Sequence, residues 1–343
     1  MLFRSSTCHE NGTLRRELTV REGLLVLEPY QSLPAMYLAH NADEVRTASD
    51  WLRNFVYRVE RERGLDFTED LFAPCTMVFA LAGGTAATVI ASTEPHQASD
   101  AMEFRRAEVV RRAALQKPFA EAPSLLAALS LAADQFIVQR GDGHSVIAGY
   151  PWFGDWGRNT MIALPGLTLS TGRPDIARGI IDAFAATVNE GMLPNRFPDA
   201  GEQPEYNTVD ATLWYFEAIR AWLEHTADET TVRERWYELL CDIIGWHERG
   251  TRHGIRMEDD GLLHSGEMGV QLTWMDAKIG DWVVTPRTGK AVEIQALWYN
   301  ALRIMEDLAR CYGDGMHAEK FAAMRSEEHT SELQSLAYLV CRL

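Results

Sequence analysis

The connections between the predicted helices constrain the fold of this chain more than any other feature. From about residue 122, apolar residues recur with the helical period, which predicts helices at roughly 124–140, 158–171, 174–190, 208–226, 228–250 and 291–312, with a seventh starting near 316. Connections at 172–173 and about 227 are very short, whereas three are long: 141–157, 191–207 and 251–290. Because long and short connections alternate, an up-and-down array brings all three long loops to one end. We expect an α/α toroid with a site at one rim; a plain helical bundle is the alternative.

The first hundred residues have a different, β-like pattern. Residues 17–27 are rich in β-branched residues and leucine, and an extended segment places five side chains on one side: Trp51, Arg53, Phe55, Tyr57 and Val59. A turn is expected at Ala82-Gly83-Gly84. Residues 1–99 therefore predict an incomplete β-sandwich, and the charged stretch 100–121 predicts a linking helix that ends near Pro118. The fold class predicted for the whole chain is mainly α.

Composition and charge exclude several classes of protein. The chain has 343 residues, enough for two domains, and its net charge of −16 argues against a nucleic-acid partner. No apolar run approaches the roughly 18 residues of a membrane span. Five widely spaced cysteines predict neither a disulfide framework nor a zinc site, which favours a reducing compartment such as the cytoplasm. The histidines have no metal-ligand spacing, so we expect no metal and no cofactor.

The first long loop combines aromatic and charged side chains within 149–160, GYPWFGDWGRNT. Trp152 could wall a sugar pocket, and Asp155 with Arg158 could bind adjacent hydroxyls, although the two could instead form an ion pair at a helix start. The second loop, 191–210, contributes Asn195 and Asp210. Asp210 could instead cap or pack at the start of its helix.

The third long loop contains the candidate acid. Trp274 and Trp282 surround Asp276, and Lys278 is close by in sequence. Indole faces suit the apolar side of a pyranose, and a carboxylic acid among indoles can be tuned to donate a proton near neutrality. Glu293 follows as a second polar contact or as a favourable charge in the first turn of a helix. A surface loop with tryptophans that merely pack is the alternative.

Three strings within residues 140–312 resemble the amylo-α-1,6-glucosidase part of glycogen debranching enzymes: PWFGDWGRNTMIALPGL, NTVDATLWYF and TWMDAKIGDWVVTPRTGKAVEIQALWYNAL. The upstream string RNFVYRVERERGLDFTEDLFAPCT is similar to the β-sandwich that precedes that barrel in prokaryotic members. The resemblance implies an (α/α)6 barrel, of which residues 122–324 would be the N-terminal half. It also implies removal of α-1,6-linked glucosyl branches from glycogen or branched maltodextrin, with inversion and release of glucose. Asp276 would be the general acid, and the glucose pocket would be lined by Trp152, Asp155, Arg158, Asp210, Trp274 and Lys278.

The sequence departs from this family in two places. The family usually has aspartate after the arginine, whereas this chain has Asn159, which implies weaker substrate binding because an amide lacks the charge that strengthens a hydrogen bond. Inversion also needs a second carboxylate as base, about 6.5–9.5 Å from the acid. The family base lies in a late loop of a twelve-helix toroid, and six or seven helices are expected here. We therefore expect this chain to be a fragment that is inactive or nearly so.

The tail has a separate explanation. Its start, RSEEHTSELQS at 325–335, resembles an in-frame translation of a common sequencing adapter, and the following LAYLVCRL lacks family resemblance. We expect native coding to end near Met324 and residues 325–343 to be non-native. A genomic read that encodes these residues in frame would refute this.

Two other functions compete with the leading hypothesis. One is a non-catalytic α-glucan-binding protein that keeps the aromatic pocket. The other is a different hydrolase on the same toroid, of trehalase or glucoamylase type. A structural protein without ligand is disfavoured, because the aromatic and acidic residues gather in the loops and not along the helical stripes.

Overall fold

The computed structural model describes residues 8–31, 33–84, 86–150, 153–196, 203–280 and 282–325. The chain divides into two compact units, Leu2–Ala114 and Leu115–Leu343. The division falls inside the segment predicted as a linking helix, which forms α2 (Ala101–Gln116). The predicted non-native tail lies, apart from Arg325, outside the described residues.

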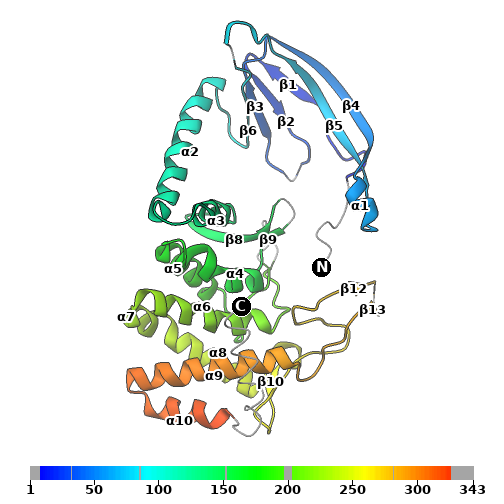
Figure 1. The fold of residues 1–343 in the computed structure, drawn as a ribbon. Coiled ribbons are helices and arrows are strands. Elements are labelled where there is room, and N and C mark those ends of the chain that lie inside the picture. Colours follow the sequence, from blue (N-terminus) through cyan, green and yellow to red (C-terminus); the bar gives the residue numbers. More distant parts are fainter. Residues whose placement is uncertain are drawn as a thin grey trace. The chain divides into compact units, whose positions relative to one another are not determined.

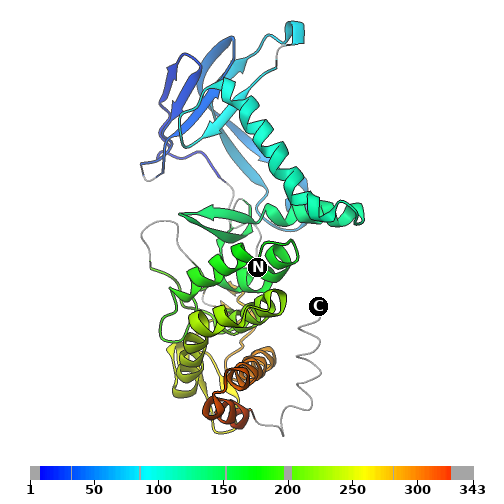
Figure 2. The same cartoon turned by 90° about the vertical axis from the view of Figure 1, so that its left-hand side faces the viewer.

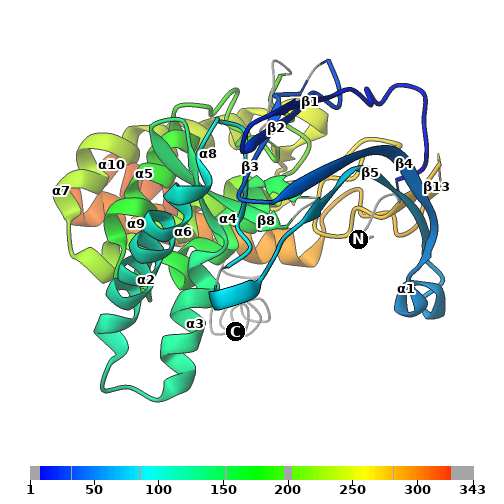
Figure 3. The ribbon, with the colours of Figure 1, turned by 90° about the horizontal axis from the view of Figure 1, so that it is seen from above.

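The N-terminal unit contains two antiparallel sheets. Four short strands follow the order β1-β2-β3-β6: β1 (Leu18–Arg21), β2 (Leu24–Leu27), β3 (Met36–His40) and β6 (Val89–Ser92). The second sheet is a long curved pair, β4 (Glu44–Val56) and β5 (Thr68–Val78), visible in Figures 1 and 3. The predicted turn at Ala82-Gly83-Gly84 is a short 3-10 turn between β5 and β6.

One detail of the extended segment predicted around Trp51 is wrong. Strand β4 ends at Val56, and Val59 belongs to the helix α1 (Arg58–Glu62) that joins β4 to β5. The register of β4 also shifts between Leu52 and Phe55, where Asn54 has a positive φ of 61° and donates its backbone N–H to Asp70 at 2.9 Å. A bulge of this kind changes which residues share a face, so simple alternation fails beyond Leu52.

Helices dominate the C-terminal unit. They are α3 (Ser124–Asp134), α4 (Gly157–Leu164) with its π-helical extension (Pro165–Leu169), α5 (Pro174–Ala185), α6 (Asp210–Thr226), α7 (Glu229–Thr231) leading through a π-helical turn (Val232–Trp236) into α8 (Tyr237–Arg249), α9 (Val292–Tyr312) and α10 (Gly315–Met324). Their bounds lie close to the predicted ranges, with two exceptions, the first being the helix predicted over 174–190, which ends at Ala185. The helix predicted over 124–140 ends at Asp134, because residues Ile137–Arg140 form strand β7.

A small sheet occupies the first long loop. Strand β7 pairs with β8 (Gly143–Gly149), which pairs in turn with β9 (Phe153–Asp155), all antiparallel. The long connection predicted at 141–157 therefore contains two strands that were not predicted. The whole chain is a mixture of helix and several small sheets, so the mainly α prediction holds only for part of it, and the toroid stays a proposal.

Helices α4, α6 and α9 form a row, with α6 in contact with both neighbours. Arg158 and Asp210, at the starts of α4 and α6, are in direct contact. Asn300 of α9 donates to Glu217 of α6 at 3.0 Å, and each residue lies about two turns into its helix. In Figures 1 and 2, α6 lies between α4 and α9. The starts of α4 and α6 meet at the Arg158–Asp210 pair.

The core of this unit lies between that row and the helices packed on it. Tyr215, Phe216, Trp236 and Trp298 are fully buried or nearly so. Trp222 of α6 meets Trp236 edge-on, with ring centroids 5.1 Å apart. None of the described helices combines the length and the hydrophobicity that a membrane span requires.

Candidate active site

The starts of α4 and α6 are held together by close backbone contacts. Gly157, the first residue of α4, donates its N–H to the carbonyl of Asn195 at 2.8 Å. A Cβ at Gly157 would lie 2.3 Å from the carbonyl oxygen of Pro194, so only glycine fits there. This contact fixes the second long loop against the start of α4 and sets the position of Arg158.

Arg158 connects two of the predicted acidic residues. Its Nε lies 2.9 and 2.8 Å from the two carboxylate oxygens of Asp210, and its Nη1 lies 3.5 Å from Oδ2 of Asp276. The side chains of Arg158 and Asp210 are buried, whereas that of Asp276 is 33% exposed. One guanidinium thus joins the first, second and third predicted loop segments.

Asp210 is held more firmly than Asp276. Thr208 donates its hydroxyl to Asp210 at 2.6 Å and accepts the backbone N–H of Ala211, which also fixes the start of α6. Burial raises the pKa of Asp210, and its contacts with Arg158 and Thr208 oppose that rise. These contacts hold the carboxylate of Asp210 against Arg158. Asp276 makes a longer contact with Arg158 and is more exposed to solvent.

A cavity of about 430 Å³ lies beside Arg158. Trp274 and Asn159 line it with Arg158, and apolar side chains complete the wall: Phe136, Val146, Ile147, Ala148, Ile162, Ala163 and Leu167. Trp274 is 55% exposed, so its indole presents a free face. An apolar cavity with a few polar groups at one end is typical of a small-ligand site.

Direct contacts join the three long loops. Trp156 and Arg196 form an isolated β-bridge between the first and second loops. Val209 donates its N–H to the carbonyl of Leu272 at 2.9 Å, which joins the second and third loops. The loops therefore gather where the N-termini of α4 and α6 meet.

Several buried polar atoms in these loops lack a hydrogen-bond partner within the described part of the chain, and two of them flank the site. They are Oδ1 of Asn195, whose residue is 4% exposed, and Oγ1 of Thr273, whose residue is 1% exposed. Such an atom costs about 1–3 kcal/mol unless water or a ligand satisfies it. Asn195 is thus a buried acceptor beside the start of α4, whereas Thr273 was not singled out from the sequence.

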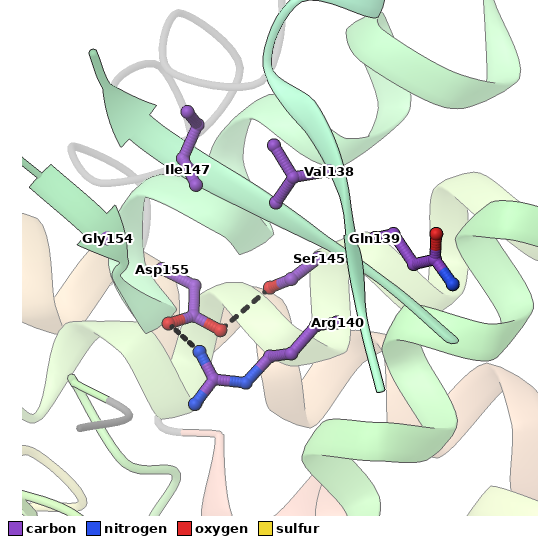
Figure 4. Close-up of a pocket in the computed structure, with 7 residues that line it drawn as sticks. All are labelled: Val138, Gln139, Arg140, Ser145, Ile147, Gly154 and Asp155. Atoms are coloured by element: carbon purple, nitrogen blue, oxygen red, sulfur yellow. Dashed lines mark hydrogen bonds and ion pairs between the residues drawn. The ribbon is translucent and has the colours of Figure 1, made fainter. Parts of the chain in front are cut away.

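Asp155 does not contact Arg158 in any described interaction; it binds residues of the small sheet. Arg140 donates to its Oδ1 at 2.6 Å, and Ser145 donates to its Oδ2 at 2.9 Å (Figure 4). The Asp155 side chain is 2% exposed and borders a separate cavity of about 260 Å³ with Arg140 and Ser145. Arg140 and Ser145, and not Arg158, bind the carboxylate of Asp155, so the alternative ion pair at the helix start does not form. The fork that Asp155 and Arg158 could make to sugar hydroxyls stays a prediction.

The remaining predicted residues have different positions. Lys278 is exposed in the short strand β12 (Lys278–Ile279). Glu293, in the first turn of α9, pairs with Arg287, and its Oε1 is buried without a hydrogen-bond partner among the described residues. Trp152 lies outside the described residues. Within the described ranges, no group of three or more His, Cys, Asp or Glu is arranged to hold a metal ion.

Comparison with known proteins decides the family. A family model described as amylo-alpha-1,6-glucosidase matches residues 131–334, more than half of the chain. The chain belongs to the amylo-alpha-1,6-glucosidase family. A second model, described as glycogen debranching enzyme N terminal, matches residues 3–88. This member of the family is thus a debranching-enzyme-type protein, and the predicted resemblance is confirmed.

Individual relatives of this amylo-alpha-1,6-glucosidase family member are more distant. The glycogen debranching enzyme of Saccharomyces cerevisiae is 29% identical over 223 residues, and the match covers 48% of this chain and 14% of the yeast protein. The crystal structure of a GH78 family rhamnosidase of Bacillus sp. GL1 is 14% identical, with a TM-score of 0.44, and the match covers 89% of this chain and 32% of that one. A likeness of that size carries no argument about the fold or the activity.

Proposed function

We propose that the C-terminal unit holds the glucosyl pocket of an α-1,6-glucosidase that acts on glycogen or branched maltodextrin, with inversion. The observation that carries this proposal is the contact of Arg158 with both Asp210 and Asp276 beside the cavity that Trp274 lines. The indole of Trp274 provides the apolar face that a pyranose needs, and Arg158, Asn159 and Asn195 provide polar groups for its hydroxyls.

Asp276 is the proton donor in this proposal. The acid must reach the glycosidic oxygen while positive charge develops on the sugar ring. Asp276 is suited to this role because it is one-third exposed and its contact with Arg158, at 3.5 Å, is longer than a hydrogen bond. Asp210 is not, because Arg158 and Thr208 occupy both of its oxygens.

No carboxylate among the described residues is assigned as the base that activates water. The described carboxylates in contact with Arg158 are Asp210 and Asp276, and Asp210 is fully engaged. We therefore expect the 343-residue chain to bind α-glucan and to release little or no glucose. Robust release of glucose from a dextrin with α-1,6-linked glucosyl branches would overturn this expectation.

Calorimetric titration of the chain with isomaltose tests the pocket. Trp274→Ala should weaken binding about tenfold, because it removes the exposed indole from the cavity wall without touching the core. Met316→Ala is the matched control, since Met316 is an exposed residue at the start of α10. Equal affinity of the Trp274→Ala variant and the wild type would contradict the proposal.

Titration with other disaccharides, together with a hydrolysis assay, separates the competing functions. A glucosidase of trehalase or glucoamylase type should prefer an α,α-1,1- or α-1,4-linked disaccharide over isomaltose. Glucan binding without hydrolysis by any longer protein that contains this chain would favour the non-catalytic alternative.

A further inference from the structure

The hairpin that follows Asp276 has one apolar face. Strands β12 and β13 (Trp282–Val283) pair Ile279 with Trp282 and Lys278 with Val283. Directly paired side chains share a face of an antiparallel pair. The N–H of Val284 donates to the carbonyl of Ala277 at 3.2 Å, which continues the ladder by one pair. Ala277, Ile279, Trp282 and Val284 therefore form one strip, and Lys278 lies on the opposite face.

This apolar strip is open to solvent. Ile279 is 66% exposed, Trp282 is 62% exposed and Val284 is 39% exposed. Scattered single apolar residues are normal on a protein surface, whereas a contiguous exposed strip that includes an indole is a surface on which a ligand can bind. The four residues carry no charge, which suits a neutral ligand. A second copy of this chain, with a net charge of −16, would be repelled electrostatically.

The position of the strip indicates which part of a substrate it contacts. Lys278, the first residue of the hairpin, is two residues after Asp276, so the two backbones are at most about 7 Å apart. A general acid protonates the oxygen that departs with the leaving group, so the leaving sugar chain lies on the acid's side of the cleaved bond. The strip therefore begins beside the place where the leaving glucan must lie.

We propose that Trp282, flanked by Ile279 and Val284, is a separate subsite that binds the α-glucan chain from which the glucosyl branch is cut. Trp282 would stack on the apolar face of a main-chain glucose unit, while Trp274 and Arg158 hold the branch. This inference rests on the proposed function, because it assigns Asp276 as the acid.

Titration of the 343-residue chain with two ligands tests the subsite. One ligand is isomaltose; the other is a maltodextrin that carries a single α-1,6-linked glucosyl branch. Trp282→Ala should weaken binding of the branched maltodextrin about tenfold and change the affinity for isomaltose less than threefold. Trp282→Phe should retain most of the affinity, because it keeps an aromatic face. Ile279→Ser should weaken binding of the branched maltodextrin about threefold, and Met316→Ala should change neither affinity.

The outcomes distinguish a failure of the Trp282 subsite from a failure of the proposed α-1,6-glucosidase function. Unchanged affinity for the branched maltodextrin in Trp282→Ala and Ile279→Ser would overturn the subsite while the glucosyl pocket stands. Loss of self-association in Trp282→Ala without any change in glucan affinity would make the strip a protein interface and overturn it as well. Binding of neither ligand by the wild type would refute the proposed function itself.

Discussion

The two units of this chain bury their apolar side chains very differently. In the N-terminal unit, the buried hydrophobic residues among those described are Leu25, Leu27, Ala39 and Trp51. Many of its other large apolar side chains stay exposed, including Leu52 at 50% and Val56 at 51%. The C-terminal unit has one extended core that runs from Val146 to Met324.

The difference explains where a precise site can be built. Arg158, Asp210 and Glu293 lie in the first turns of helices that bury one face in the core. Side chains on well-packed helices hold their geometry better than side chains on loops or thin sheets. We therefore expect the C-terminal unit to unfold in a separate transition from the N-terminal unit and to be the more stable of the two.

The largest effect should come from the C-terminal core. Trp236→Ala should lower the free energy of unfolding of that unit by about 3–5 kcal/mol, because the ring is fully buried. The variant also loses the hydrogen bond of 2.9 Å from the indole to Asp182. Urea unfolding followed by circular dichroism measures the change. Trp51→Ala is the control in the N-terminal unit and should lower the free energy of unfolding of that unit by less. An equal or larger loss would contradict the difference in burial between the two units.

The next effect separates the two carboxylates of Arg158. Asp210→Asn should destabilise the C-terminal unit by about 3 kcal/mol, since it leaves a buried guanidinium without its main partner. Asp276→Asn removes a partly exposed partner and should cost at most about 1 kcal/mol. Thermal unfolding of both variants measures the difference. Equal losses would mean that Asp276 is a structural ion-pair partner and not an accessible acid.

Acid should destabilise the C-terminal unit through His247. Burial lowers the pKa of His247 to about 4, against 6.5 for the free side chain, so the folded state resists a proton that the unfolded chain accepts. The stability that depends on neutral His247 is complete above pH 6.5 and falls by about 2–3 kcal/mol as the pH drops toward 4. Urea unfolding across this range should show a smaller slope with pH in His247→Gln. The same slope in both proteins would refute the assignment.

The smallest effect concerns the bulge in β4. Asn54 adopts a left-handed conformation with φ of 61°, which asparagine tolerates better than alanine. Asn54→Ala should cost about 1 kcal/mol in the N-terminal transition, whereas Asn54→Gly should cost less. Thermal unfolding can resolve the two variants. A greater loss with glycine than with alanine would show that the side chain of Asn54, not its backbone, matters.

The sequence predicted the helical part of the fold well, because short-range periodicity sets where helices form. Apolar stripes at 176–188 and 232–243, together with the short connections between helices, predicted α5 and α8, although α5 ends at Ala185 and not at 190. The strand at Ile137–Arg140 was missed because it follows an apolar helix without a break in composition. What holds it is pairing with residues 143–146, a contact that periodicity alone does not report.

The candidate site was only partly predictable for a similar reason. Arg158, Asp210 and Asp276 were all named from the sequence, and the structure brings them together. The partners of Asp155 were missed because Arg140 lies 15 residues away along the chain and reaches it across the small sheet. The aromatic residues around Asp155 in the sequence do not predict which basic side chain forms an ion pair with it.

The central claim is that Arg158, Trp274 and Asp276 surround one glucosyl unit. A crystal structure of this chain with isomaltose tests it most directly. We predict that the non-reducing glucose stacks on Trp274, with the glycosidic oxygen about 2.6–3.2 Å from a carboxylate oxygen of Asp276. An ordered sugar bound elsewhere, or one in the cavity whose glycosidic oxygen lies beyond the reach of Asp276, would contradict the account.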